Sequence, residues 1–324
     1  MIEKHGISII IPCYNSGRYL RETVASVFAQ GCTIPFEIIL VDDGSTDNGY
    51  TVGVIKSLSR DHPGHIRAGF IPENSGQSTA RNTAIAMAQY RYILPLDSDD
   101  RLATAPGLTG AMSYMARACT MMDQNPDLVM VYARAEFFEG HRGPWVLPPY
   151  NERMILLHNM VPCYAVCRRD DVVRAGGYNP AMRAFEDWDL SIALINNRYR
   201  AGLPAEVHRF DEPYYQYRIR RTADNVSQQQ VSPADILSAA FRRSPEIYRR
   251  HFNLSPQQSE KSAIDILLQH HTIMAKDYKR IVLLESLTFT GIQMAIAHRA
   301  SRVGQHISRR LAAIVDPVLS FVRS

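Results

Sequence analysis

The chain has 324 residues, of which 46% are hydrophobic and 21% charged, and its formal net charge is +4 at pH 7. This composition is that of a soluble globular protein with a sizeable core, and it excludes a disordered or fibrous chain. The cysteines are scattered and show neither zinc-like paired spacing nor a disulfide framework. We therefore expect buried thiols in a reducing compartment. They are Cys13, Cys32, Cys119, Cys163 and Cys167.

Neither a leader nor a membrane span is expected from the apolar runs. Residues 1–6 lead directly into a strand, and the longest apolar run, 281–297, is short and interrupted by Glu285 and Gln293. From Arg218 onward the sequence has sixteen Lys and Arg against eight Asp and Glu, a charge of +8. We expect a cytoplasmic protein whose basic C-terminal part contacts the inner face of the membrane as a peripheral protein.

Strand and helix patterns alternate through the first hundred residues. Apolar runs predict strands at 7–11, 36–41, 66–71 and 92–96, and helical spacing predicts helices at 18–30 and 78–89. A weaker helix follows the second strand, where Gly49 and Gly53 lower the helical propensity. This alternation predicts an α/β fold with a Rossmann-like, mostly parallel sheet and helices on both faces. Pro95 cannot donate to a ladder, so a bulge is expected there.

The remaining elements are expected in two groups. Strands are predicted at 128–132, 164–166 and 214–218, a loop at 140–149, and helices at 169–175 and from 185 to about 197. From residue 232 the chain is predicted to be mostly helical. Ser232-Pro233, Ser244-Pro245 and Ser255-Pro256 are expected helix starts, with Gln258 completing a capping box. We expect a first domain, 1–230, and a helical C-terminal region, 231–324.

Carboxylates follow two of the predicted strands. Asp97, Asp99 and Asp100 come directly after the fourth strand, and Asp42 and Asp43 after the second. On an extended chain, residues two apart point the same way, about 7 Å along the strand, so Asp97 and Asp99 can converge on one ligand. Oxygen ligands suit Mg²⁺ or Mn²⁺ beside a phosphate-bearing substrate. The alternative is a solvated acidic turn that caps the next helix. In parallel sheets, ligands bind at the rim where these acids lie.

Six motifs occur along the chain, each at a predicted strand end or helix start. They are Ile9 to Asn15, Val41 to Asp47, Gly76 with Ala80-Arg81-Asn82, Asp97 to Asp100, Gly176-Gly177-Tyr178, and Glu186 to Leu190. Over residues 5–227 this set closely resembles the family 2 glycosyltransferases. The resemblance implies a GT-A fold, with residues 1–230 as the catalytic domain. It also implies inverting, hexosyltransferase-type transfer of one sugar from a nucleotide-diphosphate sugar, a UDP-sugar by preference, to a hydroxyl.

The resemblance also implies roles for individual residues. Asp187 would be the general base and Glu186 would shape the acceptor side; Asp99 would contact Mn²⁺ or Mg²⁺ directly, and Asp97 would contact the metal or the ribose. Asp42 would accept a hydrogen bond from the base. The other donor-site residues implied are Pro12, Tyr14, Asn15, Asp43, Gly76, Arg81 and Ser98.

Structural explanations remain open beside these roles. Pro12 to Asn15 can form a plain turn, Asp43 can cap the following helix, and Arg81 can be a surface residue. Glu186 and Asp187 are favoured at a helix N-terminus by the helix dipole alone.

The sequence departs from the family at one position. The family often has a histidine after a Tyr-Arg pair near the end of the catalytic domain, whereas here Tyr217-Arg218-Ile219 is followed by Arg220. Arginine cannot bind a metal, but it can neutralise a leaving diphosphate. The third metal ligand is therefore an open question.

Two other functions are alternatives to sugar transfer, and the sequence also suggests several partners. A non-catalytic sugar-nucleotide-binding module would be expected to lose Asp187 or Asp99, and a sugar-nucleotide pyrophosphorylase to have a glycine-rich N-terminal loop. The acceptor would be a glycan or lipid-linked hydroxyl in polysaccharide biosynthesis. Basic residues without interleaved aromatics speak against nucleic acid. The basic stretch from Arg299 to Val315 predicts contact with an anionic membrane surface, and a helical cap or homodimer contact is the alternative.

Overall fold

The computed structural model describes residues 4–104, 107–182, 184–220 and 231–299, with side chains as far as Leu287. Within these residues nine strands form one sheet in the order β3-β2-β1-β4-β8-β6-β9-β5, with β7 paired to β6. The first four strands, which run parallel to one another, are β1 Lys4–Cys13, β2 Phe36–Asp43, β3 Ile66–Ile71 and β4 Tyr90–Pro95.

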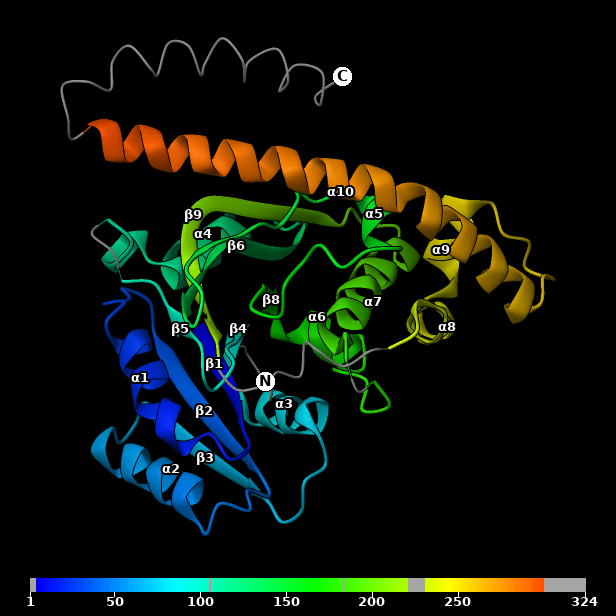
Figure 1. The fold of residues 1–324 in the computed structure, drawn as a ribbon. Coiled ribbons are helices and arrows are strands. Elements are labelled where there is room, and N and C mark those ends of the chain that lie inside the picture. The colour runs from blue at the N-terminus through cyan, green and yellow to red at the C-terminus, as the bar shows by residue number, and fades with distance from the viewer. Residues whose placement is uncertain (1–3, 105–106, 183, 221–230, 300–324) are drawn as a thin grey trace.

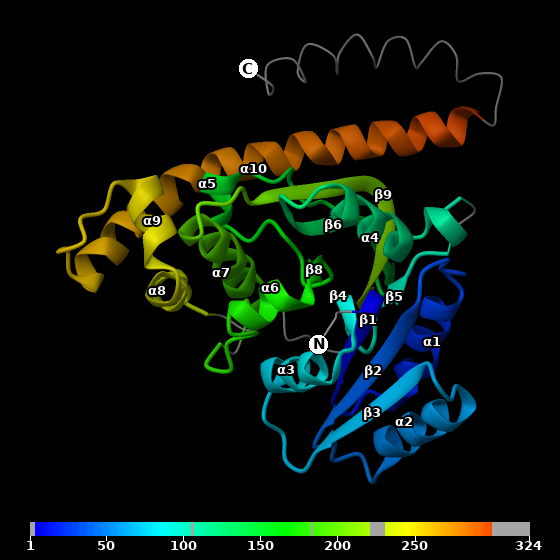
Figure 2. The same cartoon turned by 180° about the vertical axis from the view of Figure 1, so that it is seen from behind.

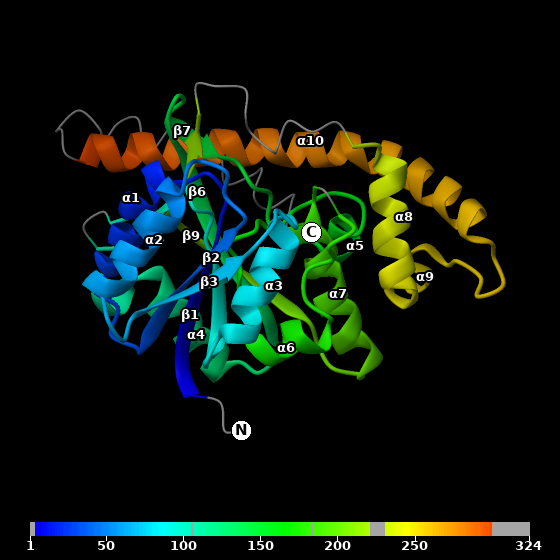
Figure 3. The same ribbon diagram turned by 90° about the horizontal axis from the view of Figure 1, so that it is seen from below.

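Helices cover both faces of this parallel part. Viewed from below, α1 Gly17–Phe28 and α2 Tyr50–Asp61 lie on one side of β1 to β3 (Figure 3). On the other side lie α3 Gln77–Met87, α6 Arg169–Arg174 and α7 Glu186–Arg200. The predicted α/β fold is confirmed, and α2 forms even though glycines stand before and within it.

The second half of the sheet mixes directions. Strand β8 (Val166–Arg168) is antiparallel to both β4 and β6 (Leu128–Glu139), and β9 (Glu206–Ile219) is parallel to β6. The edge strands of this half are β5 (Arg101–Leu102) and β7 (Gly143–Trp145). The short helices η1 (Gly110–Met112) and α5 (Glu152–Ile155), and the longer α4 (Tyr114–Gln124), complete this half.

Several expected boundaries were wrong. The strand expected at 164–166 is two residues later, the expected loop 140–149 contains β7, and β6 and β9 are much longer than their apolar runs. The expected bulge at Pro95 is absent, because Pro95 pairs in register with Ile10 and β8 pairs only with Tyr92 and Ile93. The Leu96 N–H donates to the Ile10 carbonyl, so the nitrogen of Pro95 faces the other side, beyond the end of β8.

Three helices form the C-terminal region: α8 Pro233–Arg243, α9 Pro245–Phe252 and α10 Glu260–Arg299. Ser232 caps α8 as predicted, since its Oγ accepts the Ala234 N–H at 3.2 Å. The helix start at Ser255-Pro256 was wrong, because α10 begins at Glu260. The Ser255 hydroxyl instead bonds Gln257, two residues along, a local pattern that competes with helix capping.

Helix α10 runs across the β6–β9 side of the molecule (Figures 1 and 2). Its Glu285 forms an ion pair with Arg134 at 2.9 Å, and its Tyr278 hydroxyl donates a hydrogen bond to the Asn159 carbonyl at 3.2 Å. None of the helices in the described ranges has the length and apolar character needed to cross a bilayer. The predicted basic membrane contact falls on side chains and residues outside those ranges, so it stays a prediction.

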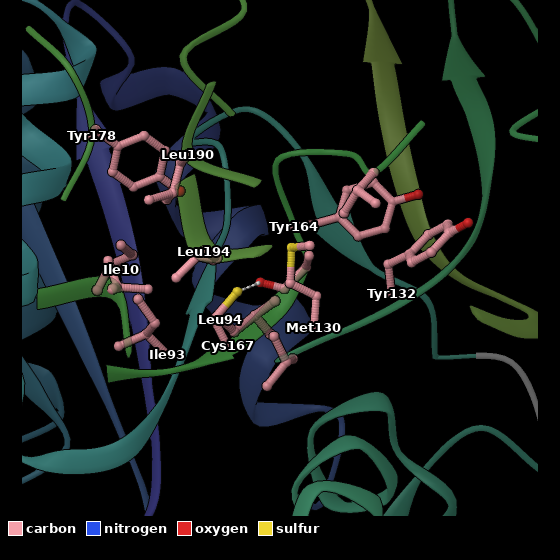
Figure 4. Packing of buried hydrophobic residues seen from close by; sticks show 14 of the residues in the cluster. Ile10, Ile93, Leu94, Met130, Tyr132, Tyr164, Cys167, Tyr178, Leu190 and Leu194 are labelled. Carbon is pink, nitrogen blue, oxygen red and sulfur yellow. Dashed lines mark hydrogen bonds between the residues drawn. The ribbon is translucent and has the colours of Figure 1, made fainter. Parts of the chain in front are cut away.

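The core joins the sheet to the helices around the candidate site. Ile10 and Ile93 come from β1 and β4, Leu190 and Leu194 from α7, and all four are at most 5% exposed (Figure 4). Burial of each such side chain stabilises the fold by about 1.5–3 kcal/mol. The first turn of α7 is thereby fixed beside the carboxyl ends of the strands.

Candidate active site

The loops after β1 and β2 are tied together by Asn15. Its N–H donates to Ser45 Oγ at 2.9 Å, and its Oδ1 accepts the Thr46 N–H at 2.8 Å. Pro12 is buried inside β1 opposite Val41, whereas Tyr14 is 45% exposed beside this junction. The first two motifs therefore form one loop cluster at the rim of the sheet.

The two acids that end β2 have different surroundings. Asp43 accepts the N–H groups of Ser75 and Gly76 at 2.9 and 2.8 Å, so it fixes the loop before α3 and does not cap α2. Asp42 is 3% exposed and accepts the Ser45 N–H at 3.1 Å through Oδ2. Its Oδ1 is buried without a partner among the described residues. Buried acceptors are nearly always paired in native proteins, so this oxygen can serve a ligand N–H.

Gly44 is required by the same loop cluster. Its φ is +65°, and an added Cβ would lie 2.6 Å from the backbone nitrogen of Asn74. We expect Gly44→Ala to lower the free energy of unfolding by about 1–3 kcal/mol, because both the φ angle and the contact oppose a side chain. Gly53→Ala in α2 is the matched control: nothing lies within 4 Å, so a gain of about 0.5–1 kcal/mol is expected. Urea denaturation of both variants checks this, and equal stabilities would contradict it.

The acidic segment after β4 is a turn, not an extension of the strand. The Asp100 N–H donates to the Asp97 carbonyl at 3.1 Å, so our expectation of extended geometry for Asp97 and Asp99 was wrong. Asp100 is 1% exposed and accepts the Tyr215 hydroxyl at 2.6 Å and the Arg218 N–H at 2.7 Å. Burial, and then the neighbouring Asp99 and Asp97 carboxylates, raise the pKa of Asp100 well above its usual range. Asp100 therefore anchors β9 to the turn.

Ser98 lies within the same turn. It is 9% exposed, and its carbonyl accepts the Thr23 hydroxyl of α1 at 3.0 Å. This contact fixes the backbone between Asp97 and Asp99 from the helix side of the sheet.

Arg81 connects two acids that are far apart in the sequence. It is 1% exposed, and its guanidinium binds Asp97 Oδ1 and Glu186 Oε1, each at 2.6 Å. The surface-residue alternative for Arg81 is therefore excluded. The neighbouring Asn82 exchanges two 2.8 Å hydrogen bonds with the backbone of Tyr178, and the Tyr178 ring centre lies 5.1 Å from the guanidinium. The start of α3 thus meets both the glycine-rich turn after α6 and the first turn of α7.

Asp187 lies in the first turn of α7. Its Oδ1 accepts its neighbour Trp188's N–H at 2.8 Å, and its Oδ2 accepts the Asn159 amide at 3.4 Å. Burial, and then the adjacent Glu186 carboxylate, raise the pKa of Asp187 to about 7. The helix is not capped by either acid, since Phe185 stands at its N-cap without a side-chain bond. A carboxyl group with this pKa can take up a proton near neutral pH.

The carboxylates expected to bind a metal are already paired with arginines. Asp97 Oδ1 accepts bonds from Arg81 and from Gln77 Nε2, the latter at 3.0 Å, and Asp99 Oδ2 accepts Arg220 Nε at 2.8 Å. Over the described ranges, no three His, Cys, Asp or Glu side chains are grouped so that they could hold an ion. The oxygen ligands seen here do not fit an open Mg²⁺ or Mn²⁺ site.

The sequence motifs did not identify four residues that contact the acids of the site. Asn159 and Cys163 come from the irregular segment between α5 and β8, and the Cys163 thiol lies 3.6 Å from Asp97 Oδ2. Gln77 and Tyr215 complete the set. No local pattern marks Asn159 or Cys163, because tertiary packing alone brings their segment to the site.

The family model "Glycosyl transferase family 2" matches residues 8–174. The chain belongs to this family. Among curated relatives, it is similar to poly(ribitol-phosphate) beta-N-acetylglucosaminyltransferase TarP of Staphylococcus aureus, with 40% identity over 98 residues, 30% of this chain and 29% of TarP. It is also similar to the minor teichoic acid biosynthesis protein GgaB of Bacillus subtilis, with 26% identity over 277 residues, 82% of this chain and 27% of GgaB. The chain thus spans less than a third of either relative.

The fold of this family 2 member has solved counterparts. S. aureus TarS 1–349 in complex with UDP-GlcNAc superposes with a TM-score of 0.56 at 20% identity, covering 91% of this chain and 87% of TarS 1–349. This likeness supports the GT-A-like sheet with its flanking helices.

Proposed function

We propose that the chain transfers one sugar from a nucleotide-diphosphate sugar to an acceptor hydroxyl, with inversion at the anomeric carbon and Asp187 as the general base. The observation that carries this proposal is the buried Arg81, which brings Asp97 on the donor side and Glu186 beside Asp187 into one site.

The reaction would be a single displacement. The acceptor oxygen bonds to the anomeric carbon while the bond from that carbon to the phosphate oxygen breaks, and the nucleotide diphosphate leaves with the electron pair. Asp187 takes the hydroxyl proton, and its pKa of about 7 suits a base that works near neutral pH. Such proton transfer contributes about 10²–10⁴-fold to the rate.

The site and the relatives support a proposal for the donor and acceptor classes. Asp42 Oδ1 is a buried acceptor that suits the ring N–H of uracil, so a UDP-sugar is the proposed donor. Pro12, Tyr14 and Asn15 would line the nucleoside pocket, and Asp43, Gly76 and Ser98 would shape the loops around the phosphates. The proposed acceptor is a hydroxyl of a glycan or of a lipid-linked acceptor, and the names of TarP and GgaB, which refer to poly(ribitol-phosphate) and to teichoic acid, support a polysaccharide of this kind.

A donor screen tests the proposal. The full chain is incubated with UDP-, GDP- and dTDP-sugars, with and without polyol-phosphate polymers and glycans, and the released nucleotide diphosphate is measured. We expect release from a UDP-sugar that rises when a suitable acceptor is added. Binding of UDP without release under any condition would show a non-catalytic sugar-nucleotide-binding module instead.

The pH profile depends on Asn159. Because the base must be ionised, kcat/KM should rise with pH through about 7 and then level off. The Asn159 amide stabilises the ionised form of Asp187 and lowers its pKa, so Asn159→Ala should move the rising limb to higher pH. Asn151→Ala, at the N-cap of α5, is the control for damage to the same segment, and only Asn159→Ala should shift the midpoint.

A further inference from the structure

Arg220 is the most exposed of the three arginines whose side chains donate hydrogen bonds to Asp97 or Asp99. Its side chain is 25% exposed, against 6% for Arg218 and 1% for Arg81. It follows the last residue of β9, and its guanidinium lies 5.3 Å from the ring centre of Tyr19 in α1. Of the three, Arg220 is therefore the one that a ligand can reach.

Arg220 also keeps donors for a ligand. Its Nε and Nη2 both donate to Asp99 Oδ2, at 2.8 and 2.5 Å. A guanidinium has five N–H donors, so three remain without a partner within the described ranges. Arg218, in contrast, is occupied by Glu22, by Glu139 and by the Asp99 carbonyl.

The ion pair holds this charge in a fixed place. Asp99 is 17% exposed and its backbone is held by Arg218, so the carboxylate fixes the plane of the Arg220 guanidinium. Planar guanidinium groups match pairs of phosphate oxygens well. A divalent ion at Asp99 would have to displace Arg220 or lie against its positive charge, which costs binding energy in a partly buried site.

We propose that Arg220, held by Asp99, supplies the positive charge that binds the donor diphosphate, so that nucleotide binding does not depend on a divalent metal ion. This inference rests on the proposed function, because the ligand must be a nucleoside diphosphate. It gives the arginine after β9 a donor-binding role and gives Asp99 the role of positioning it.

Calorimetric titration of the full chain with UDP tests the inference, in EDTA and in excess Mn²⁺. We expect the wild-type affinity to agree within about twofold between the two buffers. Arg220→Ala should weaken UDP binding about ten- to hundredfold in EDTA while leaving UMP binding nearly unchanged, because the lost contact is to the diphosphate. Arg21→Ala, on the exposed side of α1 with 58% exposure, is the matched control and should bind UDP like the wild type.

A third variant separates the two sources of charge. Arg220→His replaces the guanidinium with an imidazole, a common metal ligand, so UDP affinity should return only with Mn²⁺, and the paramagnetic signal of bound Mn²⁺ should appear. A tenfold or larger loss of wild-type UDP affinity in EDTA would overturn the inference and leave the transfer proposal standing. Failure to bind any of UDP, GDP, CDP and ADP in either buffer would overturn both.

Discussion

Asp187→Asn is expected to abolish sugar transfer while UDP binding stays within about twofold of the wild type. The amide keeps the size of the side chain but cannot take up the acceptor proton, which removes about 10²–10⁴-fold of rate. The variant should also unfold at a higher temperature at pH 8. The folded-state pKa of Asp187 is raised to about 7, so the ionised form weakens the fold once the pH rises through that value.

The control for this experiment is Asp170→Asn. Asp170 is also an acid in the first turn of a helix, α6, but it is 47% exposed and lies in a surface ion pair with Arg169. It should leave both transfer and stability close to the wild type. Wild-type turnover by Asp187→Asn, measured with a donor and acceptor that the wild type uses, would refute the assignment of the base.

Arg81→Met should cost about 3–5 kcal/mol of unfolding free energy and nearly all transfer activity. Methionine keeps much of the length of the side chain but removes the charge, which leaves the mostly buried carboxylates of Asp97 and Glu186 without a cation. In the proposed mechanism those two acids belong to the donor and acceptor sides, so both halves of the site should relax together. Urea denaturation and the transfer assay measure the two effects.

Two further variants make this prediction specific. Arg81→Lys keeps one charge but cannot hold two opposed carboxylates in a fixed plane, so an intermediate stability is expected. Arg280→Ala removes an arginine that is 79% exposed and paired with the exposed Asp277, and it should change stability by less than about 1 kcal/mol. If Arg81→Met proved as stable as Arg280→Ala, the bridging role of Arg81 would be disproved.

The sequence predicts the parallel half of the fold well because that half is built from local signals. Continuous apolar runs give β1 to β4, and the motif acids fall where those strands end. The second half is harder to predict because its strands continue into polar residues. Strand β9 includes Arg209, Asp211 and Glu212, whose side chains form hydrogen bonds with residues of other elements. Pairing with β6 over its whole length, not hydrophobic periodicity, defines that strand.

The same distinction applies to the candidate site. The residue types at Asp42, Asp97 and Asp187 follow from motifs, but their partners do not. Sequence spacing leaves open whether Arg81 faces solvent, a phosphate or another side chain. Only the tertiary fold places it between Asp97 after β4 and Glu186 in the first turn of α7. The amide of Asn159 comes from a segment with no recognisable motif.

The hydroxyl of Tyr278 ties the segment that carries Asn159 to a helix 119 residues further along the chain. Replacing helix α10 with that of another protein would therefore leave the loops after β1 and β2 in place yet remove the anchor of the segment that contacts Asp187. Exchanging tails between relatives would alter acidity and turnover before it altered donor choice. In this chain, the surroundings of the proposed base therefore depend on a contact from α10.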